Sequence, residues 1–202
     1  MKRSILLLSV WAACIALTLP GFGEPALLAG YECKRIKVPA EDTFYNIQLA
    51  CRALQNTVLL EGKTFSFNKS IEKVRQYFKP GPFVMGTSTI MKDGGGICQV
   101  STALYQAALK AGLKIREQHP HSAFLSSIDY CKKGQDAAVS MEPLKDLRIT
   151  NNAGGPVLIQ FFARDKTTVE IRIIRLDSPS PGPVSSTKGS PGLAEKRIPG
   201  RI

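Results

Sequence analysis

The chain has 202 residues, of which 44% are apolar and 21% are charged, and its formal net charge at pH 7 is +11. This length leaves room for one sizeable globular domain with appendages. A single apolar run near membrane-spanning length excludes a polytopic membrane protein, and the apolar fraction excludes a mainly disordered chain. The 17 Gly and 13 Pro residues indicate a fold rich in turns rather than a long helical bundle.

The N-terminus has the three parts of a secretory signal peptide. Lys2 and Arg3 supply the positive start, Ile5 to Leu19 is almost entirely apolar, and residues 20–23 break any helix near a cleavage site. We therefore expect residues 1–23 to be a signal peptide, with a retained single-pass anchor as the alternative. In both cases the domain would work outside the cytoplasm, in the periplasm or at the cell surface.

Removal of a signal peptide would lower the net charge to about +9, because Lys2 and Arg3 leave with it. A basic exported protein is suited to anionic partners, such as wall polymers or a membrane surface. Export, and the lack of a basic-aromatic surface motif, argue against nucleic acid as a partner. Basic residues that simply solvate the surface are the alternative explanation of the charge.

The first elements follow from apolar spacing. Residues 24–40 are expected to form an irregular leading segment. Residues 41–60 have the 3.6-residue apolar period of a helix. Residues 63–68 alternate like a short strand, whereas residues 79–96 contain two Pro and five Gly and are expected to be mostly loop.

The second half of the domain is predicted to contain one helix and then strands. The helix begins after the three glycines at 94–96 and runs from about residue 98 to 111. Strand-like segments follow at 113–118, 123–130, 136–141, 147–150, 157–163 and 168–176. This order predicts an α+β fold, in which N-terminal helices, including the one that starts at the Gly-rich cysteine motif, pack on a mainly antiparallel sheet.

The composition changes after this domain, which we place at residues 41–176. Residues 177–202 are rich in Ser, Pro and Gly and have no apolar period. Such a segment cannot bury enough surface to fold alone, so we expect a flexible tail.

The most informative stretch is Gly94-Gly95-Gly96-Ile97-Cys98. Glycines let the backbone turn sharply, and their amides, with the first free amides of the helix, could form a pocket for an oxyanion. A cysteine at a helix start feels the positive end of the helix dipole, which favours the thiolate. Cys98 is therefore a candidate nucleophile. A small buried cysteine that closes a Gly-rich turn is the alternative.

A nucleophilic cysteine needs a base, and the chain has two histidines, His119 and His121. Residues two apart in an extended segment face the same side, so both rings could enter one cleft. Either could form a thiolate–imidazolium pair with Cys98, and Asp136 or Asp146 could orient the imidazole. Solvent-exposed histidines in a turn are the alternative.

Four cysteines follow the signal segment: Cys33, Cys51, Cys98 and Cys131. In an oxidising compartment an even number suggests two disulfides, whereas a free Cys98 leaves three cysteines for one disulfide. A zinc site built from Cys98, Cys131 and the two histidines lacks the paired spacing of known zinc motifs. We therefore expect no metal and no cofactor.

Five segments, in this order, resemble the VanW domain family: Gly62 to Asn68, Gly94 to Tyr105, Glu117 to Ser122, Gly134 to Val139 and Asp146 to Asn152. The resemblance implies an exported cell-wall protein, and some members of the family are understood to act as L,D-transpeptidases with the motif cysteine as nucleophile. It implies that this cysteine attacks the diamino-acid carbonyl of a peptidoglycan tetrapeptide stem and releases D-Ala. The acyl group would then pass to the amine of a neighbouring stem.

Carried over to this chain, the resemblance makes Cys98 the nucleophile and His121 the favoured base, because the family's motif holds more strictly to the His-Ser pair. His119 and Asp136 are the further catalytic candidates. The residues expected to bind substrate are Gly94, Gly95, Gly96, Gln99, Ser101, Thr102 and Ser122.

Three functions stay open at this point. A cysteine acyltransferase acting on peptidoglycan stem peptides is favoured, with water in place of the amine making it an L,D-carboxypeptidase. A non-catalytic wall-binding or accessory protein linked to glycopeptide resistance would use Cys98 structurally. A cell-wall cysteine peptidase would share the cysteine and histidine but end in hydrolysis.

Overall fold

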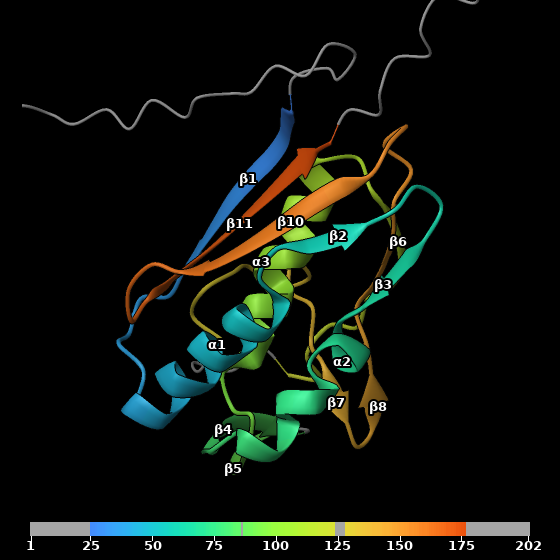
Figure 1. Ribbon diagram of the computed structural model, residues 1–202. Coiled ribbons are helices and arrows are strands. Elements are labelled where there is room, and N and C mark those ends of the chain that lie inside the picture. Colours follow the sequence, from blue (N-terminus) through green and yellow to red (C-terminus); the bar gives the residue numbers. More distant parts are fainter. Residues whose placement is uncertain (1–24, 86, 124–127, 177–202) are drawn as a thin grey trace, which may run out of the picture.

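The computed structural model describes residues 25–85, 87–123 and 128–176, so the predicted signal peptide and the predicted tail lie outside the described residues. A four-stranded sheet, a three-stranded sheet and two short hairpins accompany two long helices in this part of the chain (Figure 1). In chain order the elements are β1 (Ala26–Lys34), α1 (Glu41–Leu54), β2 (Thr57–Leu59), β3 (Thr64–Ser66), α2 (Phe67–Ser70), the 3-10 helix η1 (Glu72–Tyr77), β4 (Pro80–Met85), β5 (Ser88–Asp93), α3 (Ile97–Lys110), β6 (Lys114–Glu117), β7 (Ser140–Met141), β8 (Leu144–Lys145), β9 (Arg148–Thr150), β10 (Val157–Ala163) and β11 (Thr168–Arg175).

The larger sheet has the strand order β1-β11-β10-β2, and each neighbouring pair is antiparallel. Ile159 of β10 is opposite Ile173 of β11, and Phe161 is opposite Ile171. All four side chains are buried. Because side chains alternate between the two faces of a strand, these residues define one apolar face of the sheet.

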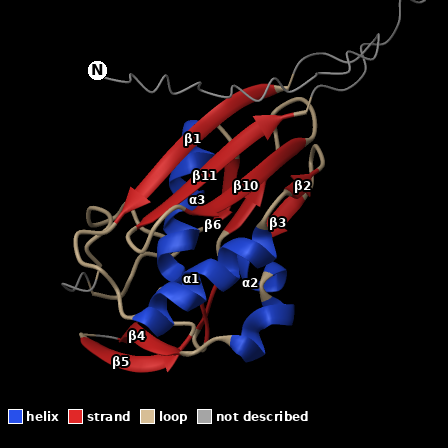
Figure 2. Ribbon diagram, turned by 60° about the vertical axis from the view of Figure 1, so that its left-hand side comes forward, coloured by secondary structure: helices blue, strands red, loops and turns tan. Residues whose placement is uncertain are grey.

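Helices α1 and α3 pack on the sheet (Figure 2). Helix α1 contacts β10, α3 contacts β1 and β11, and the two helices contact each other. Their buried residues Ile47, Leu54, Val100 and Leu104 recur at helical spacing, so each helix turns one apolar stripe inward. The core therefore lies between the helices and the sheet, and the predicted α+β class is confirmed.

The smaller sheet has the order β3-β9-β6 and lies beside the helices (Figure 1). It joins three of the predicted strand segments, because 63–68, 113–118 and 147–150 contain β3, β6 and β9. In the larger sheet, β10 and β11 match the predicted segments 157–163 and 168–176. Helix α3 begins one residue before the predicted start and ends one residue before the predicted end.

The prediction of an irregular leading segment is wrong for most of its length. Strand β1 pairs with β11 from Ala26 to Lys34, with one register shift between Leu27 and Ala29. The side chains of β1 alternate between the two faces of the sheet, and Ala29 and Cys33 are buried on the inner face. The two strands are far apart in sequence, so the partner that orders this edge strand cannot be identified from local composition.

The first helix is shorter than predicted and is followed by a strand. Helix α1 ends at Leu54, and Asn56 then adopts a positive φ of 58°. This left-handed conformation reverses the chain and stops the helix, and β2 begins at Thr57. The apolar residues at the end of the predicted helix therefore lie in β2, which is an edge strand of the larger sheet.

The segment predicted to be mostly loop forms a hairpin of β4 and β5. Their antiparallel register runs from Pro80 opposite Asp93 to Met85 opposite Ser88. Pro is tolerated here because a two-stranded hairpin consists only of edge strands, which can leave the missing N–H on the outer side. The glycine and proline content correctly predicts turns, but it gives no indication that β4 and β5 pair with each other.

The strand prediction for residues 123–130 is not borne out where it can be seen. Residues 124–127 lie outside the described residues, and residues 128–130 form no strand. Of the predicted element at 136–141, Ser140–Met141 alone is a strand, β7, and it pairs with the unpredicted β8. Within the described ranges, no helix combines the length and apolarity needed to cross a membrane.

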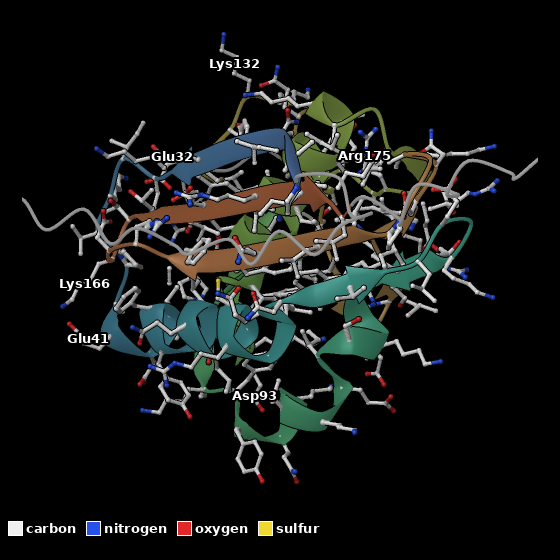
Figure 3. All side chains as sticks on the ribbon, turned by 45° about the horizontal axis from the view of Figure 1, so that its top comes forward. Glu32, Glu41, Asp93, Lys132, Lys166 and Arg175 are labelled. Carbon is white, nitrogen blue, oxygen red and sulfur yellow. The ribbon has the colours of Figure 1, made fainter. Side chains whose placement is uncertain are left out.

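Charges of both signs extend from the periphery of the domain (Figure 3). Lys166 forms an ion pair with Glu41, which joins the β10–β11 turn to the start of α1. Lys132 and Arg175 point outward from other parts of the surface, and Glu32 of β1 is followed by two basic residues, Lys34 and Arg35. The positive charge is thus distributed over several elements.

Candidate functional site

The start of α3 is shaped by glycines that are packed closely against their neighbours. Gly96, the residue before the helix, has φ 102°, a conformation that favours glycine. A Cβ on Gly96 would lie 2.6 Å from Cγ2 of Thr43, and a Cβ on Gly95 would lie 2.1 Å from the carbonyl carbon of Gly81. The glycines let α1 and β4 approach the loop, which fixes Cys98 as the second residue of the helix.

The amides of this loop divide into two groups. Gly94 donates to the Lys79 carbonyl and Gly95 to the Lys92 carbonyl, each at 3.1 Å. These two amides therefore hold the hairpin and are already used, which removes them from the predicted oxyanion pocket.

The remaining amides of the turn leave two candidate donors. Ile97 donates to Gly94 at 3.2 Å and Gln99 donates to Gly96 at 3.0 Å. Among the described residues, the amides of Gly96 and Cys98 have no backbone acceptor. If the Cys98 sulfur adds to a carbonyl carbon, the carbonyl oxygen becomes an oxyanion. This oxyanion would be near the amide of Cys98, as in sites where the nucleophile begins a helix.

Cys98, His121 and Asp136 are brought together by three different segments. The Cys98 thiol donates to the Val139 carbonyl at 3.6 Å and also hydrogen bonds with the His121 side chain. Nδ1 of His121 lies 2.6 Å from Oδ2 of Asp136, and the His121 backbone N–H donates to the same oxygen at 2.7 Å. Since Asp136 occupies Nδ1, the other ring nitrogen is the one presented to the sulfur.

Burial makes the His121–Asp136 pair strong. The side chains are 8% and 1% exposed. Burial alone acts to lower the pKa of His121, but its hydrogen bonds with Asp136 and Cys98 outweigh burial and raise the pKa to about 9. Burial likewise acts to raise the pKa of Asp136, and the hydrogen bonds from His121 reverse this and lower it. At neutral pH the imidazole is therefore protonated and its partner is a carboxylate.

The other two candidates for this network lie elsewhere. Nε2 of His119 is 2.9 Å from Oε1 of Glu117, and its side chain is 36% exposed. Asp146 accepts from the Ser66 hydroxyl at 2.5 Å and from the Asn68 amide at 2.9 Å, so it ties α2 to the loop before β9. The structure therefore places His121 and Asp136, and not His119 and Asp146, next to Cys98.

Three of the predicted substrate-binding side chains are buried and serve the packing of the domain. Gln99 donates to the carbonyls of Cys33 and Thr167 at 3.0 and 2.8 Å. Ser101 donates to the Ala137 carbonyl at 2.6 Å, and Thr102 accepts from the Ala137 amide at 3.0 Å. The two hydroxyls hold the segment that contains Asp136, so they affect the site by fixing the position of the Asp136 carboxylate.

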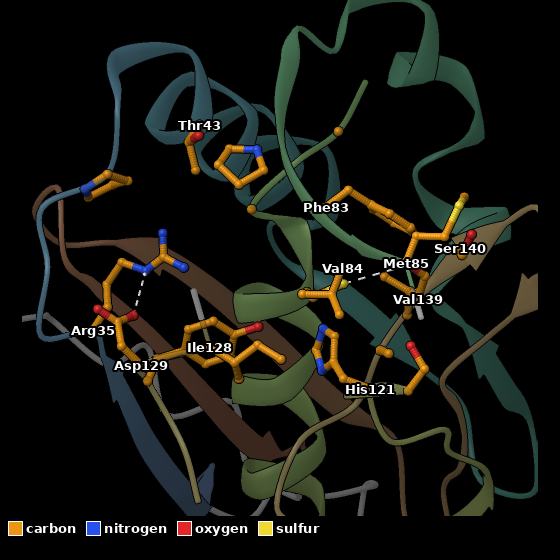
Figure 4. Close-up of a pocket in the computed structure, with 18 of the residues that line it drawn as sticks. Arg35, Thr43, Phe83, Val84, Met85, His121, Ile128, Asp129, Val139 and Ser140 are labelled. Carbon is orange, nitrogen blue, oxygen red and sulfur yellow. Dashed lines mark hydrogen bonds and ion pairs between the residues drawn. The ribbon is translucent and has the colours of Figure 1, made fainter. Parts of the chain in front are cut away.

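A cavity of about 380 Å³ lies in front of Cys98 and His121 (Figure 4). Of the predicted residues, the cavity is lined by Gly94, Gly96, Cys98, His121 and Ser122. Sequence reasoning missed the rest of the wall, which includes Arg35, Phe83, Val84, Asp129, Tyr130 and Lys145. Arg35, Phe83 and Val84 come from segments predicted to be irregular or loop, whereas Asp129 and Tyr130 come from a predicted strand. Nothing local in the sequence indicates that these residues meet.

Cys33, Cys51 and Cys131 are free, as is Cys98, so no disulfide is formed among the described residues. Burial raises the pKa of each of these three thiols to about 12. Cys33 and Cys51 are buried in the core, whereas Cys98 opens onto the cavity. Within the same residues, no group of three or more His, Cys, Asp and Glu side chains could hold a metal ion.

These features define an α+β domain with a Cys–His–Asp constellation at the start of a helix, facing a cavity. The chain matches the family described as VanW like protein over residues 42–174, and it therefore belongs to that family. The resemblance found in the sequence motifs is thus confirmed. No solved structure matches the chain at a significant level.

Two curated proteins are similar to parts of the chain. One, from Bacillus subtilis (strain 168), bears the name "Uncharacterized protein YoaR" and is 35% identical over 118 residues, which are 57% of this chain and 38% of that protein. The other, the vancomycin B-type resistance protein VanW of Enterococcus faecalis (strain ATCC 700802 / V583), is 30% identical over 116 residues, which are 55% of this chain and 42% of that protein. The match thus spans about two fifths of each relative.

Proposed function

We propose that this domain is a cysteine acyltransferase of the L,D-transpeptidase type that acts on peptidoglycan stem peptides. The observation that supports this proposal most is the position of the Cys98 sulfur, which opens onto a cavity beside an imidazole held by a buried carboxylate. An imidazolium next to a cysteine stabilises the thiolate, which is the nucleophilic form.

In the first half of the reaction the Cys98 thiolate attacks the carbonyl carbon of the diamino-acid residue in a tetrapeptide stem. The carbon–sulfur bond forms as the carbonyl oxygen becomes an oxyanion, and we expect the Cys98 backbone N–H to donate a hydrogen bond to it. When the intermediate collapses, the bond to the D-Ala nitrogen breaks. The His121 imidazolium gives its proton to that nitrogen, and D-Ala leaves as a free amine.

In the second half neutral His121 accepts a proton from the amine of a neighbouring stem as that amine attacks the thioester. A new amide bond forms, and Cys98 leaves as the thiolate, paired once more with the imidazolium. Asp136 keeps the ring in one tautomer and orientation in both halves through its contact with Nδ1. Attack by water would give a stem shortened by D-Ala.

We further propose that the protein works outside the cytoplasm, in contact with the wall. The N-terminal charge and apolar run of residues 1–23 support export, and the formal net charge of +11 suits anionic wall polymers or a membrane surface. The name of the Enterococcus faecalis relative supports a connection with glycopeptide resistance. Peptidoglycan stem peptides are the partners that this account requires.

The direct test is muropeptide analysis after the purified protein is incubated with fragments that contain tetrapeptide stems. We expect crosslinks between two diamino-acid residues with the unchanged protein, and none with Cys98→Ala. Cys51→Ala is the matched control, because Cys51 is a buried thiol outside the cavity. Free D-Ala with shortened monomers in place of dimers would assign the carboxypeptidase.

The remaining alternatives predict different results in the same experiment. A non-catalytic binding module would bind stem fragments and leave them unchanged. A wall peptidase would cut bonds other than the one to D-Ala. Full activity in folded Cys98→Ala would contradict the proposed function.

A further inference from the structure

A basic side chain forms part of the cavity wall away from the Cys–His–Asp constellation. Arg35 follows directly after β1, and its backbone N–H donates to the Thr167 carbonyl at 3.0 Å. Figure 4 shows its guanidinium directed into the cavity, on the side opposite His121. The strand pairing therefore carries a cation from the N-terminal edge of the sheet to the candidate site.

Arg35 is held in place by its neighbours. Its Nε lies 3.5 Å from Oδ1 of Asp129, and each of these side chains is 10% exposed. Oδ2 of Asp129 accepts the Lys37 backbone N–H at 2.7 Å, which fixes the carboxylate as well. The guanidinium carbon also lies 5.2 Å from the centre of the Tyr130 ring. An arginine oriented in this way binds a ligand with little further loss of side-chain freedom.

The charges of the wall favour an anion. Arg35, Lys37 and Lys145 line the cavity, whereas Asp129 is the one carboxylate among the described residues that line it. The charge of the protonated His121 is balanced by its partner Asp136. The guanidinium fork of an arginine matches the two oxygens of a carboxylate. A concave wall with this excess of positive charge attracts anionic ligands.

We propose that Arg35 binds a carboxylate of the peptide that reacts at Cys98, and so determines which peptides are accepted. The inference rests on the proposed function, since it names a recognition residue for the same cavity. A tetrapeptide stem offers two such groups near the scissile bond: the terminal carboxylate of D-Ala and a carboxylate on the diamino-acid side chain. Arg35 is a specificity residue in this account, and it takes no part in proton transfer.

The test measures binding separately from chemistry by using the Cys98→Ala protein. Three synthetic peptides are compared by calorimetric titration: a tetrapeptide with a diaminopimelate residue and a free terminal carboxylate, its terminal amide, and the analogue with lysine in place of diaminopimelate. We expect the Kd to rise about tenfold or more for the peptide that lacks the recognised carboxylate. The peptide that loses affinity identifies which of the two carboxylates binds.

In Arg35→Gln this discrimination between the peptides should fall to about twofold or less. Because this variant leaves the Asp129 carboxylate without its cation, the double variant Arg35→Gln/Asp129→Asn is measured beside it and should show the same loss. Arg75→Gln is the matched control, since it removes the same charge from an exposed position outside the cavity. It should leave the discrimination unchanged.

The inference would be overturned if both Arg35 variants discriminated between the peptides as well as the protein that retains Arg35. It would also be overturned if the Cys98→Ala protein with Arg35 intact bound all three peptides with equal affinity. Failure of the proposed function is distinguishable from these results. If the protein forms no crosslinks but Cys98→Ala still selects the carboxylate through Arg35, the cavity is a peptide-binding site without acyl transfer. If crosslinks form and the Arg35 variants retain the selection, acyl transfer stands and another residue recognises the substrate.

Discussion

Nδ1 of His121 lies 2.6 Å from the Asp136 carboxylate, and the backbone N–H of the same histidine donates to the same oxygen. One buried carboxylate thereby fixes the ring and the main chain of the candidate base together. The neighbouring Thr102 and Ser101 hydroxyls fix Ala137, which follows that carboxylate. The orientation of His121 toward Cys98 is therefore set by the packing of α3 against residues 136–139.

The charge state of His121 gives the first prediction. The chain has two histidines, so both can be followed by NMR titration. His121 should titrate near its raised pKa of about 9, and Asp136→Asn should move it down toward the ordinary value of 6.5, because the strongest interaction that raises the pKa is removed. A His121 pKa below 7 in the unsubstituted protein would contradict the geometry.

Stability should depend on the same proton. Because the folded pKa of His121 lies above its unfolded value, its stabilisation is complete below pH 6.5 and is lost as the pH rises through about 9. Asp136 has a lowered pKa, so its contribution is lost on acidification. Denaturant unfolding should therefore show a decline in the free energy of unfolding between about pH 7 and 9.5 that is smaller in His121→Gln. Equal declines in the two proteins would contradict this linkage.

The histidines should differ in their effect on activity. If Cys98 and His121 act in one proton-transfer chain, then Cys98→Ala, His121→Ala and the double variant should lose crosslinked product to a similar, near-complete extent. His119→Ala is the matched control, because its ring faces Glu117 outside the cavity. Circular dichroism of each variant shows that it is folded. Loss confined to His119→Ala would assign the base to the other histidine.

Glycine at position 95 should be required for the fold of the site. A Cβ there would meet the Gly81 backbone at 2.1 Å, so Gly95→Ala must push β4 away from the loop. We expect a cost of about 1–3 kcal/mol in the free energy of unfolding, measured by denaturant titration. Gly30→Ala is the control, because a Cβ at Gly30 meets nothing within 4 Å. A change of less than about 0.5 kcal/mol in Gly95→Ala would show that the contact is easily relieved.

The thiols should differ in reactivity toward iodoacetamide at about pH 6.5 in the folded protein. Cys98 opens onto the cavity, whereas Cys33 and Cys51 are buried and have pKa values raised to about 12. Peptide mapping should therefore find the label first on Cys98, and His121→Ala should slow its addition. Recovery of Cys98 in a native disulfide would rule out its role as nucleophile.

The sequence was sufficient for elements with a strong local period. Residues 157–163 are apolar at every position except Gln160 and lie between turn-forming segments, and helix α3 starts at a glycine run and is apolar on one stripe, so both elements are predicted within a residue. Strand β1 was missed because its order depends on β11, which pairs Tyr31 with Ile171. The β4–β5 hairpin was missed because its prolines and glycines resemble those of a loop.

The residues of the candidate site that can be predicted from the sequence are those whose types are rare in this chain. Cys98 and His121 stand out because few residues of their kinds are present and each lies in a distinctive motif. Gln99, by contrast, is polar and next to the nucleophile, yet the helix turns it into the core. Arg35 belongs to a segment predicted to be irregular and Asp129 to a predicted strand that does not form at residues 128–130. Only the folded chain brings the two side chains to the same cavity.

The central claim is that Cys98 becomes acylated, and intact-protein mass spectrometry tests it most directly. The protein is incubated with a tetrapeptide donor in the absence of an amine acceptor and quenched in acid. We predict a mass increase equal to the donor minus D-Ala, bound as a thioester that peptide mapping places on Cys98 and that is absent from Cys98→Ala. D-Ala release at full rate from Cys98→Ala, or an adduct on another residue, would contradict the account.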